Sequence, residues 1–191
     1  MDPIVIFNDW YKEELSKSRD IIPSACCLST LGLDGYPNSR FVSLKEVLSN
    51  TFIVTGPMHS RKGLEIAQSN KVSLIFWWSA SARQVRIQGE AHVISGHLAD
   101  TYFAERNKTA QLVSIISAQG KEIRDLNVLN NRFEELENLY ANKNIERPLN
   151  WGGYSIRPIR IEFMEFKTTR FHIRRLFERK NDQWSESLIQ P

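Results

Sequence analysis

Hydrophobic positions at the start of the chain recur with the spacing of an α-helix. The segment opens on Asp2-Pro3, and an N-cap aspartate followed by proline at the first helical position is a typical helix start. We therefore predict a helix within residues 1–19, whose apolar face must pack against another part of the molecule. The apolar positions on that face are Ile4, Phe7, Trp10, Tyr11 and Leu15.

From residue 24 to residue 94 the pattern changes to short apolar runs rich in β-branched and aromatic residues, which predicts strands. Asp34-Gly35 is a turn signal, and the last run alternates strictly from Val85 to Val93. Ser60–Ser69 interrupts the runs with helical character. Tight turns favour antiparallel strands that form a meander or barrel. The predicted strands are 25–31, 39–47, 51–55, 72–78 and 85–93.

Residues 97–142 have helical patterns again, and residues 150–191 return to strand. Two helices are predicted in the first segment, His97–Arg106 and Asn127–Asn142. The apolar stripe of the second helix is formed by Leu129, Phe133, Leu136, Leu139 and Tyr140. Strands are predicted at 159–166, at 169–178 and around Trp184. Helices inserted between strands, rather than after every strand, indicate an α+β fold of mainly antiparallel β structure.

Composition narrows the class of protein. A chain of 191 residues that is 41% hydrophobic suits one domain, 1–191, with its own core. The 25 basic and 22 acidic residues are spread along the chain without a polybasic tail, so nucleic acid is not the favoured partner. No apolar stretch is long enough to span a membrane, and the N-terminus carries acids where a signal peptide needs basic residues. We expect a soluble cytoplasmic protein.

Cysteine and histidine usage gives no sign of a disulfide framework or a metal site. Cys26 and Cys27 are adjacent in an apolar run, where a mutual disulfide would be strained, so we interpret them as buried thiols. None of the 4 histidines is spaced with another, or with cysteine, as zinc ligands are. The familiar motifs of nucleophilic catalysis and of dinucleotide or nucleotide binding are also absent. If the protein catalyses a reaction, the chemistry therefore needs a borrowed cofactor.

One segment is suited to binding a phosphate. A strand ending near Thr55 leads to Ser60-Arg61-Lys62-Gly63 at a predicted helix start. Free backbone N–H groups, a hydroxyl and two cations would then surround one point. The alternative is an ordinary solvated first turn of a helix, because surface arginine and lysine pairs are common.

A second cluster of cations is predicted near the C-terminus. If Thr169–Arg174 is a strand, its period of two places Arg170, His172 and Arg174 on one face. Two guanidinium groups and an imidazole repel one another unless an anion or an electron-rich ring lies between them. The alternative is an edge strand that faces water.

Three further positions combine a polar or aromatic side chain with an ordered segment. Gln84 opens the alternating strand, and Lys45 closes an earlier one; each alone is more often a surface residue than a ligand. Trp151 is followed by two glycines, which permit a close backbone approach beside a large flat ring. It could either pack in the core or cover a planar cofactor.

Taken in order, these segments resemble the pyridoxamine 5′-phosphate oxidase family over nearly the whole chain. The spaced set of motifs is far more specific than any one of them: R-F-V-S-L-K, S-R-K-G, R-Q-V-R-I-Q-G, Y-F-A-E-R, W-G-G-Y and R-F-H-I-R. The resemblance implies an FMN-binding split β-barrel with peripheral helices. It also implies a homodimer with two flavin sites at the subunit interface.

The resemblance assigns roles to residues of this chain. The implied FMN contacts are Arg40, Phe41, Val42, Lys45, Thr55, Ser60, Arg61, Lys62 and Gln84, with Gln119, Trp151 and Arg174 from the partner subunit. The implied contacts to the substrate phosphate are Lys45, Tyr102 and Arg106. Arg170 and His172 are implied to contact the substrate over its pyridine ring, as the catalytic pair.

The chain departs from the family pattern at several of these sites. Ala110 stands where the family uses a serine on the substrate phosphate, and Gly120 replaces a serine that serves the flavin. Ile173 replaces an aspartate between His172 and Arg174. The family run E-F-W-Q-G reads Glu162-Phe163-Met164-Glu165-Phe166. These changes concern substrate affinity and substrate identity.

The activity implied is oxidation of pyridoxamine 5′-phosphate or pyridoxine 5′-phosphate to pyridoxal 5′-phosphate, with dioxygen as acceptor and hydrogen peroxide as product. Two alternatives stay open at this point. One is a flavin oxidase of the same fold that acts on another aromatic substrate, as in phenazine biosynthesis, and Ala110 and Ile173 favour it. The other is a module that binds FMN or pyridoxal phosphate without turnover.

Overall fold

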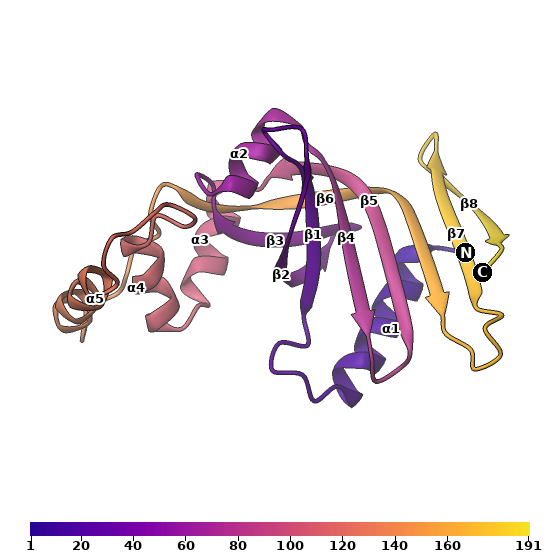
Figure 1. Cartoon of the computed structure of the whole chain (residues 1–191), viewed down its shortest axis with the longest axis horizontal. Coiled ribbons are helices and arrows are strands. Elements are labelled where there is room, and N and C mark those ends of the chain that lie inside the picture. Colours follow the sequence, from indigo (N-terminus) through magenta and orange to yellow (C-terminus); the bar gives the residue numbers. More distant parts are fainter.

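Six antiparallel strands form the centre of the molecule and close into a barrel. The computed structural model describes residues 1–191. Hydrogen bonds join the six strands in the order β3-β2-β1-β4-β5-β6, and pairing between β3 and β6 closes the ring (Figure 1). The strands are β1 (Ala25–Leu31), β2 (Pro37–Leu48), β3 (Thr51–Pro57), β4 (Lys71–Trp78), β5 (Arg83–Val93) and β6 (Trp151–Glu165).

Strand β6 belongs both to the barrel and to an extension of the sheet. Its first part pairs with β3, from Trp151 opposite Pro57 to Ile156 opposite Phe52. Its second part pairs instead with β7 (Ile173–Lys180), which is followed by β8 (Gln183–Ile189). The expected α+β class and the split barrel are confirmed, because six strands close a ring and two continue beyond it.

The first half of β6 lies where the sequence pattern predicted no strand, since only residues 159–166 were expected to be extended. The expected close backbone approach at the two glycines explains how this half fits. A Cβ added at Gly153 would lie 2.6 Å from the Val54 carbonyl oxygen. Only glycine therefore allows β6 to lie this close to β3, and this contact places Trp151 beside the end of β3.

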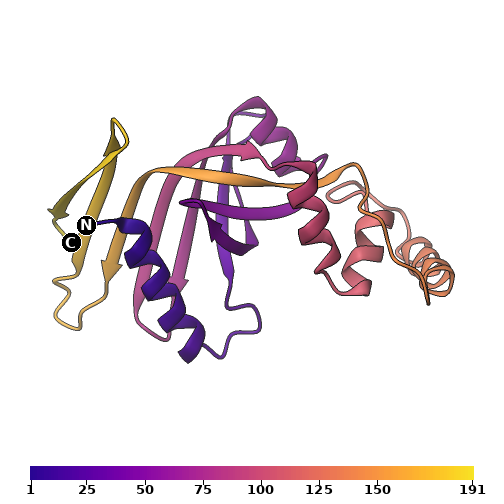
Figure 2. The ribbon, with the colours of Figure 1, turned by 180° about the vertical axis from the view of Figure 1, so that it is seen from behind.

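Helix α1 (Pro3–Lys17) confirms the expected N-terminal helix and packs on the barrel (Figure 2). Asp2 caps it by accepting a hydrogen bond from the Ile4 N–H at 2.9 Å. Phe7 is fully buried and meets Phe52 edge-on, with ring centroids 4.8 Å apart. At the other end, the buried Glu14 carboxylate accepts a hydrogen bond from the Ser81 hydroxyl at 2.7 Å, which ties the helix to the β4–β5 turn.

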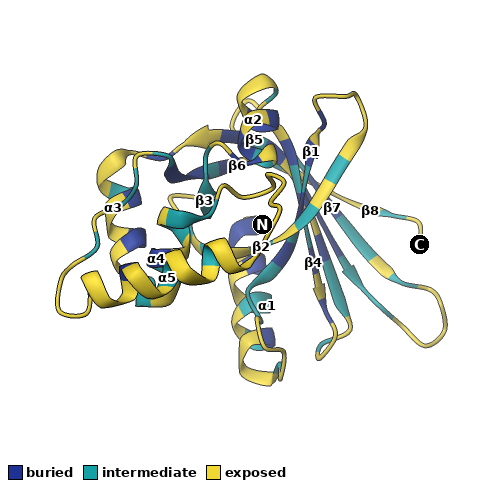
Figure 3. Ribbon diagram, turned by 60° about the vertical axis from the view of Figure 1, so that its left-hand side comes forward, coloured by how far each residue is buried: buried dark blue, intermediate teal, exposed yellow.

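Four more helices follow at one end of the barrel: α2 (Arg61–Gln68), α3 (Gly96–Ala104), α4 (Lys108–Ile116) and α5 (Asn127–Leu139). Three of them were predicted, whereas α4 was not, because its run of β-branched residues has low helix propensity. The missed signal is Asn107, whose side chain caps α4 by accepting from the Ala110 N–H at 2.8 Å. Helix α5 buries Leu136 and leaves most of its surface exposed (Figure 3).

The prediction of a continuous strand over residues 169–178 is wrong for its first four residues. Strand β7 begins only at Ile173, and Arg170 lies in a turn with a left-handed φ of 67°. The Arg170 N–H donates to the Lys167 carbonyl at 3.1 Å. The chain must reverse there because β6 and β7 are antiparallel. Arg170, His172 and Arg174 therefore do not share one face of a strand.

The two cysteines are free thiols, and Cys26 lies in the barrel core as expected. Burial raises the pKa of Cys26 to about 12, with a further contribution from neighbouring Cys27. Cys27 is only partly buried. None of the helices has the length and apolar character needed to cross a membrane.

Candidate functional site

A cavity of about 340 Å³ opens between β2, β3, the start of α2, and α4. Three cations line it, Lys45, Lys62 and Arg106, and no aspartate or glutamate does. None of the three forms an ion pair, whereas Arg40, Arg61 and most other arginines of the protein do. The complete lining is Phe41, Val42, Ser43, Lys45, Thr55, Gly56, Pro57, Lys62, Arg106, Val113, Ser114, Ser117, Gln119 and Trp151.

At one end of the cavity, Lys62 has only neutral partners. Its Nζ donates to the Ser60 hydroxyl at 3.2 Å and to Gln119 Oε1 at 3.0 Å. Burial lowers the pKa of Lys62, and the nearby Arg40 lowers it further. Ser60 is the N-cap of α2, but its hydroxyl donates to the Pro57 carbonyl and leaves the N–H groups of the first turn uncapped. This end thus offers a cation and free backbone donors to an anion.

Arg40 and Arg61 lie beside this end and are held by a buried carboxylate, Glu65. Arg61 Nε donates to Glu65 Oε1 at 2.9 Å, and Arg40 Nη2 donates to Glu65 Oε2 at 2.8 Å. Arg61 also pairs with Asp34 at 2.6 Å. Burial alone would raise the pKa of Glu65, but hydrogen bonds from Asn38, Thr30 and the two arginines lower it to about 2. Of the two cations expected at this phosphate, Arg61 and Lys62, only Lys62 therefore lacks a carboxylate partner.

Arg106 lies toward α4, where its guanidinium is incompletely bonded. Nη2 donates to the Ala110 carbonyl at 3.2 Å, and the group lies 5.2 Å from the centre of the Trp151 ring. Its Nε is buried without a hydrogen-bond partner, and burial lowers the pKa of Arg106. Lys45 reaches the same cavity from an irregular point of β2, where the pairing register shifts between Leu44 and Glu46.

Tyr102 does not line the cavity, although it was expected on the substrate phosphate. It is buried in a small apolar cluster with Trp151. Its hydroxyl donates a hydrogen bond to the Glu46 carboxylate, a group that the sequence patterns did not single out. Burial and this hydrogen bond both raise the pKa of Tyr102.

Gln119 and Trp151 line the cavity of their own chain, whereas the resemblance assigned both to the partner subunit. The segment after α4 brings Gln119 to Lys62, and the β3–β6 pairing sets Trp151 opposite Pro57. Trp151 is 1% exposed and meets Phe103 edge-on at 5.2 Å. Core packing is thus its main environment, although its ring also forms part of the cavity wall.

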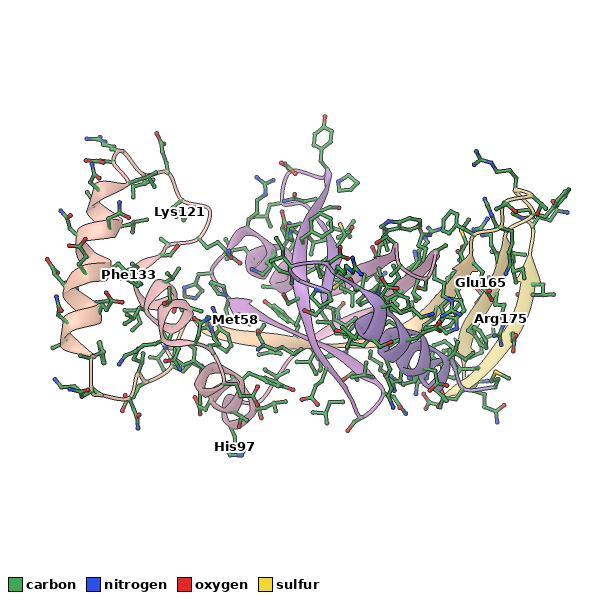
Figure 4. All side chains as sticks on the ribbon, turned by 90° about the horizontal axis from the view of Figure 1, so that it is seen from below. Met58, His97, Lys121, Phe133, Glu165 and Arg175 are labelled. Carbon is green, nitrogen blue, oxygen red and sulfur yellow. The ribbon has the colours of Figure 1, made fainter.

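The remaining expected site residues lie toward the other end of the molecule. Gln84 pairs with Met164 between β5 and β6, and Met164 pairs with Arg174 of β7. Arg174 donates to the buried Glu162 carboxylate at 2.9 and 2.7 Å. Figure 4 separates the two regions, with Met58 and Lys121 on one side and Glu165 and Arg175 at the far end. A single chain therefore does not bring Arg170, His172 and Arg174 to the cavity.

His172 is oriented by the loop that connects β6 and β7. Its Nδ1 accepts a hydrogen bond from the Lys167 N–H at 3.1 Å, and its ring lies 4.9 Å from that of Phe166. Because Nδ1 accepts, the neutral ring carries its hydrogen on Nε2. The imidazole thus has one N–H free to donate to a bound molecule.

The sequence patterns missed several lining residues of the cavity, chiefly those from α4. Val113, Ser114 and Ser117 all come from this helix or its C-cap. The Asn107 cap would have predicted the helix, and helical spacing would then have put Ala110 and Ser114 on one face.

A six-stranded split barrel with flanking helices and a cation-lined cavity defines a flavin split-barrel oxidase. Residues 16–140 match the family described as pyridoxamine 5′-phosphate oxidase. Residues 151–191 match the pyridoxine 5′-phosphate oxidase C-terminal dimerisation region. The chain belongs to the pyridoxamine 5′-phosphate oxidase family.

Individual relatives and solved structures agree with this assignment. Pyridoxine/pyridoxamine 5′-phosphate oxidase of Leptospira interrogans is 36% identical over 100% of this chain and 89% of its own length. The protein of that name from Cyanothece sp. PCC 7425 is 35% identical, with the same shares covered. The structure of PhzG from Burkholderia lata 383, in complex with tetrahydrophenazine-1-carboxylic acid, has a TM-score of 0.92 and 26% identity, covering 100% of this chain and 93% of that chain. A pyridoxamine 5′-phosphate oxidase-related, FMN binding protein from Nostoc punctiforme has the same fold, with a TM-score of 0.80, 18% identity and 97% of each chain covered.

Proposed function

We propose that this protein oxidises pyridoxamine 5′-phosphate or pyridoxine 5′-phosphate to pyridoxal 5′-phosphate, with FMN as cofactor, dioxygen as acceptor and hydrogen peroxide as product. The observation that carries the proposal is the set of unpaired cations in one cavity, with Lys62 toward α2 and Arg106 toward α4. FMN and the substrate each carry a phosphate, so the site needs unpaired cations at two separate points. The relatives named pyridoxine/pyridoxamine 5′-phosphate oxidase support the same activity.

The Lys62 end fits the phosphate of FMN. Lys62 lacks a carboxylate partner, and it belongs to the first turn of α2, whose N–H groups are not capped by the Ser60 side chain. Arg40, Arg61 and Ser60 line a second hollow that shares Phe41, Val42, Lys62 and Gln119 with the cavity. When bound, FMN supplies the acceptor for the hydride of the substrate. The chain supplies the cations that fix its phosphate.

The Arg106 end fits the phosphate of the substrate. We assign Lys45, which lines the same cavity, to this end as well, so that it and Arg106 provide two positive charges for the phosphate. The buried Nε of Arg106 still lacks an acceptor. Fixing the phosphate sets the direction of the rest of the vitamer, which is worth more to the reaction than any strong acid or base. His172 would then donate from Nε2 to the substrate, and Arg170 would lie against its ring.

Arg170, His172 and Arg174 can reach the cavity only from a second copy of the chain. Residues 151–191, which include all three, correspond to the C-terminal dimerisation region of the family. In one chain this segment extends away from the cavity along β7 and β8 (Figure 1). We therefore infer a homodimer in which each site takes Lys45, Lys62 and Arg106 from one subunit and the β6–β7 loop from the other.

The second candidate function is oxidation of another aromatic substrate, one that carries a carboxylate instead of a phosphate. Ala110 offers no hydroxyl, and the Tyr102 hydroxyl is bonded to Glu46, so the substrate phosphate has fewer donors than the family pattern provides. PhzG, whose structure is a complex with tetrahydrophenazine-1-carboxylic acid, has the same fold at a TM-score of 0.92. A carboxylate carries less charge than a phosphate and needs fewer donors.

Anaerobic spectra of the FMN-loaded protein separate these functions. We expect pyridoxine 5′-phosphate to bleach the flavin band, and air to restore it with formation of hydrogen peroxide. Bleaching only by tetrahydrophenazine-1-carboxylic acid would favour the second function. Binding of pyridoxal 5′-phosphate without bleaching by any vitamer would indicate a module without turnover.

The Lys62→Ala variant should bind FMN about 10–100-fold more weakly, because a charge-assisted contact contributes about 1.5–3 kcal/mol. Riboflavin, which lacks the phosphate, should bind wild type and variant alike, as measured by quenching of flavin fluorescence. Lys12→Ala on the exposed side of α1 is the matched control. Equal loss of riboflavin and FMN affinity would place Lys62 away from the phosphate.

A further inference from the structure

The substrate end of the cavity has two cations but lacks the hydroxyl donors that the family pattern would put there. Ala110 carries only a methyl group, and Tyr102 lies outside the lining with its hydroxyl donated to Glu46. Phosphate oxygens are strong acceptors, and Lys45 and Arg106 alone leave some of them without a donor. A further donor must come from another lining residue.

Ser114 lies next to Arg106 through a shared acceptor. It follows Ala110 by one turn of α4, on the same face of the helix, and it lines the cavity. Its hydroxyl donates to the Ala110 carbonyl at 2.8 Å. The same carbonyl oxygen accepts a hydrogen bond from Arg106 Nη2 at 3.2 Å. One backbone oxygen thus keeps a hydroxyl and a guanidinium side by side at the cavity wall.

The hydrogen bond of Ser114 within its own helix is easily exchanged. A serine hydroxyl rotates freely, and its bond to the carbonyl four residues earlier does not stabilise a helix. When an anion arrives beside Arg106, the hydroxyl can turn toward it, because a charged acceptor makes the stronger hydrogen bond. The Ala110 carbonyl still accepts from Arg106 after this rotation.

We propose that Ser114 is a binding residue for the phosphate of the substrate and acts together with Lys45 and Arg106. The inference rests on the proposed function and identifies which side chain completes its anion site. Ser16 of α1 is a matched control, because its hydroxyl also donates to a carbonyl of its own helix, that of Glu13 at 2.7 Å, but it is exposed and does not line the cavity.

The test compares Ser114→Ala and Ser16→Ala in the FMN-loaded enzyme. One neutral donor contributes about 0.5–1.5 kcal/mol, so Ser114→Ala should raise the KM for pyridoxine 5′-phosphate by about 2–10-fold. We expect kcat to change by less than about twofold, the pattern of a contact made equally in ground and transition states. The KM for unphosphorylated pyridoxine should not change in Ser114→Ala, and Ser16→Ala should leave the KM for pyridoxine 5′-phosphate at the wild-type value.

A second readout does not depend on turnover. Binding of pyridoxal 5′-phosphate, followed by quenching of tryptophan fluorescence, should weaken in Ser114→Ala by the same factor and not in Ser16→Ala. If that binding is unchanged in Ser114→Ala, or weakens equally in both variants, the role of Ser114 is overturned. If it weakens only in Ser114→Ala while the wild type oxidises no vitamer, the anion site stands and the proposed oxidation falls.

Discussion

Glu65→Gln is expected to lower the free energy of unfolding by about 3–5 kcal/mol, the usual effect of removing one partner from a buried ion pair. The Glu65 side chain has no exposed surface and accepts hydrogen bonds from Asn38, Thr30, Arg61 and Arg40. A glutamine accepts at one atom only and turns an NH2 group toward these donors. At least one arginine then loses its partner beside the barrel wall.

Urea denaturation followed by tryptophan fluorescence measures this loss. Glu13→Gln is a suitable control, because the Glu13 side chain is partly exposed, unlike that of Glu65, and pairs with Lys17 and Arg83 near the surface. Such surface pairs contribute little to stability. Equal stability of wild type and Glu65→Gln would mean that the buried carboxylate is not required to hold Arg40 and Arg61.

Lowering the pH should destabilise the folded protein through the same carboxylate, that of Glu65. Folding lowers the pKa of Glu65 from its ordinary value of 4.5 to about 2. Its stabilising contribution is therefore complete above pH 4.5 and is lost as the pH falls toward 2. Stability of Glu65→Gln should fall less steeply over this range than that of the wild type. The pKa of Glu13 is lowered similarly, but Glu13 is present in both proteins and cancels in the comparison.

Local patterns were sufficient to predict those elements whose signals lie within themselves. Helix α1 has its cap and its apolar stripe in one segment, and β5 alternates strictly, so both were predicted correctly. The first half of β6 was not predicted, because Gly152 and Gly153 are poor strand formers. Its conformation depends on pairing with β3, about a hundred residues earlier in the chain. The turn at Arg170 was missed because the alternation of side chains continues through it.

The sequence was sufficient to predict the cations that line the candidate site, but not which cations form ion pairs with carboxylates. Lys45, Lys62 and Arg106 were all expected contacts, and the structure gathers them in one cavity. The pair of Arg61 and Glu65 is an i, i+4 contact within the predicted helix, which helical spacing could have indicated. The sequence could not indicate that Glu65 would also pair with Arg40, because these residues lie 25 positions apart and only the folded arrangement brings them together.

Mixing two inactive variants should restore activity if each site is shared between subunits. One chain carries Lys62→Ala and the other His172→Ala, with FMN at a concentration that leaves the Lys62→Ala homodimer unloaded. His172 is preferable to Arg174, because removing Arg174 would leave the buried Glu162 with fewer partners. In the heterodimer one site combines the intact Lys62 of one chain with the intact His172 of the other. Random exchange makes about half of the dimers mixed, and each mixed dimer has one intact site out of two. The mixture should therefore reach about a quarter of wild-type activity.

The reciprocal mixture distinguishes this outcome from simple stabilisation of weak subunits. When wild type is mixed with a chain that carries both Lys62→Ala and His172→Ala, neither site of the heterodimer is intact. Exchange should then lower activity from about half of the wild-type value to about a quarter, because only unmixed wild-type dimers remain active. Native mass spectrometry verifies that heterodimers have formed. If they form, and the first mixture gains no activity while the second loses none, Lys62 and His172 do not act in one shared site, and each subunit must assemble its site from its own residues.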